Sequence, residues 1–175
     1  MIIDSSSLII FAKANRLDIF IKLYGDVDIT KEIYKETVED GLTIDAPDAK
    51  LIREYVENKK IKILELNEKH KIIFNNLKKI YSQLGDGEAS AIVLALQIKN
   101  GIIIDEKIAR QVSKLYGLKP IGTMRVLLEA YKKRTVNEGE LEEIVAEIIK
   151  YKFRIGADVL NEFWNAFHKL KKKRS

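Results

Sequence analysis

Short apolar runs alternate along this chain with longer amphipathic stretches. Four runs are rich in β-branched residues and have the length of strands, at residues 1–3, 27–29, 61–64 and 102–104. The run at 102–104 consists of three isoleucines, which is typical of a parallel strand covered on both faces. The run at 61–64 alternates in polarity, which indicates a strand at the edge of a sheet.

The segments between these runs have the periodicity of helices. We expect helices over residues 7–14, 17–23, 30–40, 47–58, 67–83, 88–98, 107–116, 123–134, 138–152 and 158–170. Thr30 and Thr123 are suitable N-caps, and Gly41 and Gly117 are suitable residues to end a helix. The helix from Glu88 is apolar on nearly every side, which indicates burial. Strands separated by helices predict an α/β fold with a parallel sheet, followed by a helical C-terminal extension.

Composition excludes several classes of protein. The chain has 175 residues, no cysteine and two histidines, so disulfide scaffolds, thiolate zinc sites and cysteine nucleophiles are excluded. No apolar run is long enough to span a bilayer and no signal peptide is visible, so we expect a cytoplasmic protein with no membrane partner.

The net charge of +5 comes from the C-terminal tail. Without its five basic residues, the chain has 26 basic and 26 acidic residues; the five are Lys169, Lys171, Lys172, Lys173 and Arg174. Such a tail is either a solvated end or a contact for phosphates.

Two aspartates directly follow strand-like runs, Asp4 after residues 1–3 and Asp105 after residues 102–104. Ligands of open parallel sheets bind at the carboxyl ends of the strands. Each aspartate also precedes a predicted helix, where an Asp N-cap contributes about 1 kcal/mol. Because both aspartates are expected at the same edge of the sheet, a shared ligand-binding site is favoured over two unrelated helix N-caps.

Two glutamates are further candidates. Glu88 begins the buried helix, where its carboxylate either offsets the helix dipole, with Asp86 as N-cap, or faces a cation. Glu36 lies beside the apolar stripe of the third predicted helix, where it is either a surface charge or a site residue, and Glu32 and Glu39 compete for that role.

If these four acids converge, their like charges need a cation, because the nearby sequence offers few Lys or Arg residues. Mg²⁺ or Mn²⁺ suits oxygen ligands, and such metals activate water and stabilise the leaving oxygen in phosphodiester cleavage. The motifs G-x-x-x-x-G-K-[ST], G-x-G-x-x-G, H-E-x-x-H and G-x-S-x-G are absent from the sequence.

Four segments, in this order, resemble the PIN-domain family, in the branch with a Gly-x-Glu acid motif that is similar to VapC-type toxins. They are IIDSSSLIIFAK at 2–13, ITKEIYKETVEDG at 29–41, LGDGEASAIVLA at 84–95 and IIIDEKIARQVSKLYGLKPIGT at 102–123. The resemblance implies a three-layer, Rossmann-like α/β/α sandwich with a central parallel sheet. It also implies a PIN-like nuclease domain over residues 1–135 and a helical C-terminal extension with a basic tail over 136–175.

The resemblance further implies a ribonuclease that binds Mg²⁺ or Mn²⁺ and cleaves single-stranded RNA. Its catalytic, metal-binding acids would be Asp4, Glu36, Glu88 and Asp105. Glu36 would either bind the metal or orient the attacking water. Accessory positions are Ser6, Glu106, Arg110 and Thr123. Many PIN proteins have Asp where this chain has Glu88, so this ligand has a longer reach.

Partners follow from the same resemblance. Many relatives are restrained by a small antitoxin protein that inserts at the acidic cleft, and relatives commonly form homodimers. The apolar residues Phe163, Trp164 and Phe167 either form such an interface or pack on the chain's own core. Two alternative functions remain open: a non-catalytic PIN-fold module that binds RNA or protein, and a structure-specific DNA nuclease.

Overall fold

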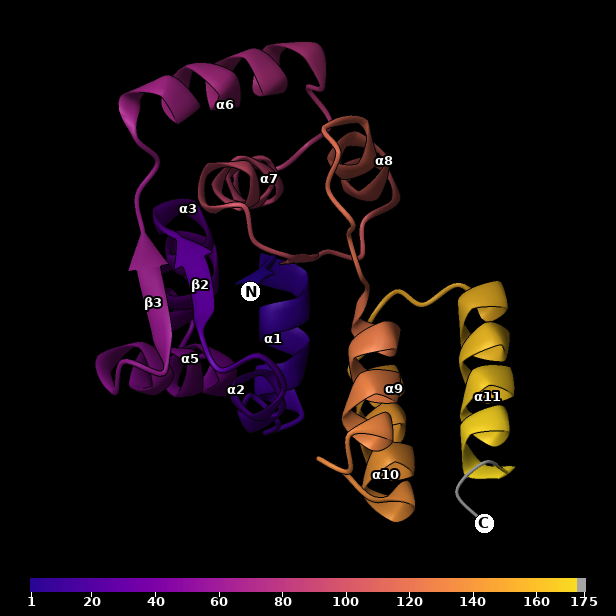
Figure 1. Cartoon of the computed structure of the whole chain (residues 1–175). Helices are drawn as coiled ribbons and strands as arrows, with labels where there is room; N and C mark the ends of the chain where they lie inside the picture. Colours follow the sequence, from indigo (N-terminus) through magenta and orange to yellow (C-terminus); the bar gives the residue numbers. More distant parts are fainter. Residues whose placement is uncertain (173–175) are drawn as a thin grey trace.

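The protein is built around a parallel β-sheet (Figure 1). The structure is a computed structural model, and it describes residues 1–172. Within these residues the sheet has the strand order β3-β2-β1-β4, with β1 at Ile2–Ile3, β2 at Val27–Thr30, β3 at Ile61–Leu64 and β4 at Ile102–Ile103. All pairings are parallel, with Ile2 opposite both Asp28 and Ile102. Beyond β4, Ile121 forms a parallel bridge to Ile103. The parallel α/β prediction is confirmed, and β3 lies at an edge as expected.

Helices connect the strands and complete a three-layer α/β/α arrangement (Figure 1). They are α1 (Ser5–Lys13), α2 (Asp18–Tyr24), α3 (Lys31–Tyr34), α4 (Asp40–Thr43), α5 (Pro47–Glu57), α6 (Glu68–Ile80), α7 (Asp86–Ile98), α8 (Lys107–Leu115), α9 (Thr123–Lys132), α10 (Glu138–Lys150) and α11 (Ala157–Lys172). A π-helical turn, η1 (Lys35–Glu39), joins α3 to α4.

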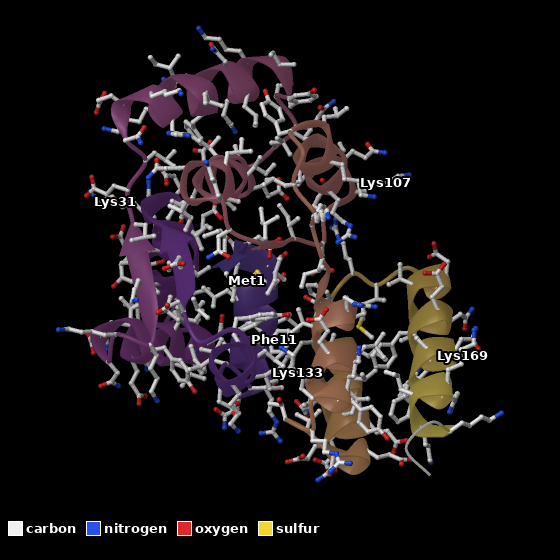
Figure 2. All side chains as sticks on the ribbon, viewed as in Figure 1. Met1, Phe11, Lys31, Lys107, Lys133 and Lys169 are labelled. Atoms are coloured by element: carbon white, nitrogen blue, oxygen red, sulfur yellow. The ribbon has the colours of Figure 1, made fainter. Side chains whose placement is uncertain are left out.

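Helix α7 is the central buried element. It packs against β1, β2 and β4, and its residues from Ala89 to Ala95 are buried, as its uniformly apolar sequence predicts. The core continues beneath α1, where Phe11 is fully buried and its ring lies 4.2 Å from that of Phe20 (Figure 2). This packing holds the carboxyl ends of the strands in place.

Several predicted helix boundaries are wrong. Thr30 caps α3 as expected, but the helix continues through η1 and α4, so Gly41 does not end it. Gly122, not Thr123, is the N-cap of α9. Gly117 has a φ of +80° directly after α8, which confirms its predicted role.

The C-terminal helices pack on the rest of the chain. Phe163 and Phe167 of α11 are buried, and the Phe167 ring meets Tyr131 of α9 edge-on at 4.9 Å between centroids. Trp164 is half-buried beside them. Lys133, at the end of α9, donates to the backbone carbonyl of Leu23 (Figure 2). The two phenylalanines therefore belong to the chain's own core.

The basic tail is described in part. Lys169 lies on the exposed side of α11 (Figure 2). Lys171 forms an ion pair with Glu138 of α10. Lys173 and Arg174 lie outside the described residues. None of the helices within residues 1–172 combines the length and the apolar content required to cross a bilayer.

Candidate active site

Three consecutive serines at the start of α1 connect three of the four predicted acids. Asp4 follows β1 and caps α1, accepting from the Ser7 amide at 2.9 Å and from the Ser6 hydroxyl at 2.8 Å. The Ser7 hydroxyl donates to Asp105 at 3.1 Å, and the Ser5 hydroxyl donates to Glu36. One helical turn thus positions carboxylates from three separate parts of the sequence.

Asp105 caps a different helix from the one that the sequence predicts. It accepts from the Thr123 amide at 3.0 Å and from the Thr123 hydroxyl at 2.6 Å, at the start of α9. Glu106, not Asp105, caps α8, through the Ala109 amide at 2.7 Å. Gly122 permits this approach, because a Cβ there would lie 2.7 Å from the Asp105 carboxylate.

Glu36 is carried by the π-helical turn. Such turns are rare and occur frequently at functional sites. Besides the Ser5 hydroxyl, its carboxylate accepts from the Gly87 amide at 3.0 Å, in the first turn of α7. A Cβ on Gly87 would lie 2.7 Å from the Ser5 hydroxyl and would also meet the Glu36 carboxylate. Gly87 is therefore required for this contact.

Glu88 closes a capping box at the start of α7. Its carboxylate accepts from the Gly85 amide at 2.9 Å, and Gly85, not Asp86, is the N-cap. The carboxylate is half-buried and faces Glu106 and Glu36. Glu88 is thus the predicted acid that has no hydrogen bond to the serines of α1.

Burial and mutual repulsion make two of these acids weaker. Burial raises the pKa of Asp4 to about 6; the charge of Asp105 acts in the same direction, and the hydrogen bonds from Ser7 and Ser6 oppose it. Burial also raises the pKa of Glu88, the charges of Glu106 and Glu36 add to this, and the Gly85 hydrogen bond opposes it. Within residues 1–172 no ion pair joins Asp4 to a basic side chain.

Two cavities open on either side of Asp105. The first, of about 420 Å³, is also lined by Ser6, Glu88 and Glu106. The second, of about 370 Å³, is lined by Arg110 and by residues of α9 and α11. Arg110 donates to the Ile104 carbonyl at 2.9 Å, next to Asp105. All four predicted accessory residues therefore lie at the site: Ser6, Glu106, Arg110 and Thr123.

A family model described as a PIN domain matches residues 1–169. The chain belongs to the PIN-domain family. PIN domains are generally nucleases and typically use divalent metal ions. No curated protein matches this sequence. The match extends through α10 and most of α11.

The donor set of this PIN domain has the chemistry that Mg²⁺ and Mn²⁺ prefer, because it consists of carboxylate and hydroxyl oxygens. Asp4 is 1% exposed and has no cationic partner within residues 1–172, which is costly for an ionised carboxylate. In the arrangement described, however, no three acidic or histidine side chains of residues 1–172 are grouped closely enough to hold an ion. Metal binding therefore requires these acidic side chains to rearrange.

Several residues of this site were missed by sequence reasoning. Ser5 and Ser7 stand directly after Asp4, so the run of three serines was a local signal for them. Gly87 stands next to Glu88, and Gly122 next to Thr123, so both were also adjacent to predicted residues. No local signal points to the basic and aromatic residues from the C-terminal region that line the first cavity.

Proposed function

We propose that this PIN domain is a metal-dependent endoribonuclease that cleaves single-stranded RNA. The observation that carries the proposal is the hydrogen-bonded set Asp4, Glu36 and Asp105, joined by the serines of α1 beside a cavity that Glu88 also lines. Asp4 and Asp105 follow β1 and β4, at the carboxyl end of the strands where ligands of such folds bind.

Asp4, Glu88 and Asp105 would hold the metal. A bound Mg²⁺ or Mn²⁺ supplies an activated water and stabilises the leaving oxygen of the phosphodiester. Ser7 holds Asp4 and Asp105 near each other, because its amide donates to Asp4 and its hydroxyl donates to Asp105. The Thr123 hydroxyl donates to the same oxygen of Asp105, Oδ2, as the Ser7 hydroxyl does.

Glu36 would orient the attacking water. It is exposed, and each of its oxygens accepts one hydrogen bond, from Ser5 and from Gly87. A carboxylate has about four acceptor positions, so Glu36 retains room for a water while both protein contacts hold it.

Partners are part of the proposal. The resemblance to VapC-type proteins supports a toxin of a toxin–antitoxin pair, whose antitoxin would occupy the same acidic cleft, and a homodimer. A dimer would have twice the chain mass of 20.1 kDa by light scattering.

The test is cleavage of a labelled single-stranded RNA with Mn²⁺ or with EDTA. We expect cleavage with Mn²⁺ alone, and a loss of at least about 100-fold in Asp105→Asn, because the charge that a hard cation requires is removed. The matched control is Asp26→Asn. Asp26 is an exposed acid that directly precedes β2, so it lies at the amino-terminal end of the strands, away from the proposed site.

Other outcomes of this assay would contradict the proposal or favour one of the two alternative functions. A folded Asp105→Asn protein that cuts at the wild-type rate would contradict the assigned site. Cleavage of single-stranded or branched DNA but not RNA would favour the DNA nuclease, and binding without cleavage of either would favour the non-catalytic module.

A further inference from the structure

The cavity beside the acids has a second wall that comes from the C-terminal region. The connector, residues 151–156 between α10 and α11, contributes Tyr151, Lys152, Phe153 and Arg154 to it. Helix α1 contributes Ser6 at one end and Lys13 at the other. Ser6 and Lys13 are about 10 Å apart along the helix axis. The cavity therefore runs from the acids toward a basic end.

The basic side chains of this cavity are not neutralised by the acids of the chain. Lys13, Lys152 and Arg154 are exposed, and none of them forms an ion pair within residues 1–172. Three uncompensated cations beside an acidic centre leave an anion-binding surface next to the bond-breaking site.

Two aromatic side chains lie in the same wall. Tyr151 is 40% exposed and Phe153 is half-buried. Single-stranded nucleic acids are bound by this combination, in which cations contact the backbone and aromatic rings stack on unpaired bases. The volume of about 420 Å³ lies within the range of pockets that hold small ligands, about 300–1,000 Å³.

The backbone at the start of the connector is held by hydrogen bonds to the end of α10. Helix α10 ends in a Schellman motif, in which the Phe153 amide donates to Ile148 at 3.3 Å and the Lys152 amide to Ile149 at 2.9 Å. Lys152 has a φ of +56°, a conformation that favours glycine. A lysine thus stands at a position where glycine would fit the backbone at least as well.

We propose that the connector and Lys13 form a subsite that holds the nucleotides of single-stranded RNA next to the scissile phosphodiester. The cations bind the flanking phosphates, and Tyr151 stacks on a base. This inference rests on the proposed ribonuclease function and names the part of the chain that selects an unpaired substrate.

The matched pair of variants is Lys152→Gly and Lys59→Gly. Lys59 has the same place in a Schellman motif at the end of α5, with a φ of +57° and the Lys60 amide donating to the Tyr55 carbonyl. It precedes β3, so it lies at the amino-terminal end of the strands, away from the cavity. Both substitutions remove one charge and suit the backbone, so both proteins should fold. Affinity for a fluorescent single-stranded RNA is measured in EDTA, over a range of salt concentrations, so that binding is separate from cleavage.

We expect Lys152→Gly to weaken binding and to reduce the slope of log affinity against log salt by about 0.7, the value for one phosphate contact of a single strand. The triple variant Lys13→Gln, Lys152→Gly, Arg154→Gln should reduce the slope by about 2. Tyr151→Leu should weaken binding by about tenfold with no change in slope, because it removes stacking and no charge. Lys59→Gly should match the wild type.

Equal affinities and slopes for Lys152→Gly and Lys59→Gly would overturn the subsite. Wild-type protein that binds RNA through these residues but never cleaves it with Mn²⁺ would overturn the proposed function and leave the subsite standing.

Discussion

At the scale of single residues, Asp4 is required by the backbone and disfavoured by its surroundings. Its carboxylate caps α1 and orders two serines, yet it is 1% exposed and faces Asp105. An N-cap needs only an acceptor oxygen, which Asn supplies equally well. The cap therefore does not require the charge of Asp4, and this charge is the property that a cation would use.

The raised pKa of Asp4 predicts how stability depends on pH in the metal-free protein. The unfolded chain releases this proton near pH 4 and the folded protein near pH 6, so ionisation of Asp4 lowers stability as the pH rises between these values. Asp4→Asn has no such proton. The stability of Asp4→Asn relative to wild type should thus increase by about 2 kcal/mol between pH 4 and pH 7.

Denaturant unfolding in EDTA at several pH values measures this difference. Other acids titrate in both proteins and cancel in the comparison. A stability difference that stays constant from pH 4 to pH 7 would show that Asp4 is ionised at its ordinary pKa.

At the scale of elements, the site is a meeting point of helix N-termini. Asp4 caps α1, Glu106 caps α8, and Asp105 and Glu36 accept from the first turns of α9 and α7. Carboxylates are stabilised at such ends by the helix dipole. The arrangement holds several like charges together even before a cation is bound.

Gly87→Ala tests whether the approach of Glu36 to α7 matters for cleavage. The new Cβ would lie 2.7 Å from the Ser5 hydroxyl and would displace Glu36, so we expect RNA cleavage to fall at least tenfold. Stability should change little, because the better helix propensity of Ala, about 0.5–1 kcal/mol, offsets the displacement.

The control is Gly139→Ala. Gly139 is the second residue of α10, as Gly87 is of α7, and both helices begin with a capping box. A Cβ on Gly139 meets nothing nearer than 3.6 Å. Equal activities of the two alanine variants would mean that the position of Glu36 is irrelevant to cleavage.

At the scale of the whole molecule, the C-terminal helices complete a site that begins at residue 4. Residues of α10 and α11, including Ile148 and Phe167, belong to the same hydrophobic cluster as β1 and α7. This packing carries the connector across to the first cavity. The predicted division between residues 1–135 and 136–175 stays a prediction.

Metal binding should appear as a change in the melting temperature of the intact protein. A ligand bound only by the folded state, at 100 times its Kd, adds about 2.7 kcal/mol. For a chain of this length, Mn²⁺ should then raise the Tm by about 5–10 °C. Glu88→Gln and Asp105→Asn, which alter two of the proposed ligands, should each reduce the shift.

Glu57→Gln is the control for loss of one negative charge. Glu57 ends α5, is paired with Arg53, and lies before β3, at the amino-terminal end of the strands. This variant should retain the full shift. A Tm that responds to neither Mn²⁺ nor Mg²⁺ would count against a resident ion.

The sequence by itself determined the features that depend on neighbouring residues. The isoleucine run before Asp105, the apolar helix after Glu88 and the caps at Thr30 and Gly117 are local patterns, so the parallel sheet and the predicted acids could be read from them. Only the tertiary structure decided which groups each acid meets. Ser7 and Asp105 are 98 positions apart, and the sequence pattern around Glu36 predicts an ordinary helix, not a π-helical turn.

The same holds for the cations of the cavity. Lys152 and Arg154 belong to a connector that no motif links to Asp105, and they line the same cavity as Asp105 because apolar faces of α9, α10 and α11 bury one another. Hydrophobic burial is not directional. The sequence therefore shows that these apolar faces must be covered, but only the packed structure decides which helix covers each of them.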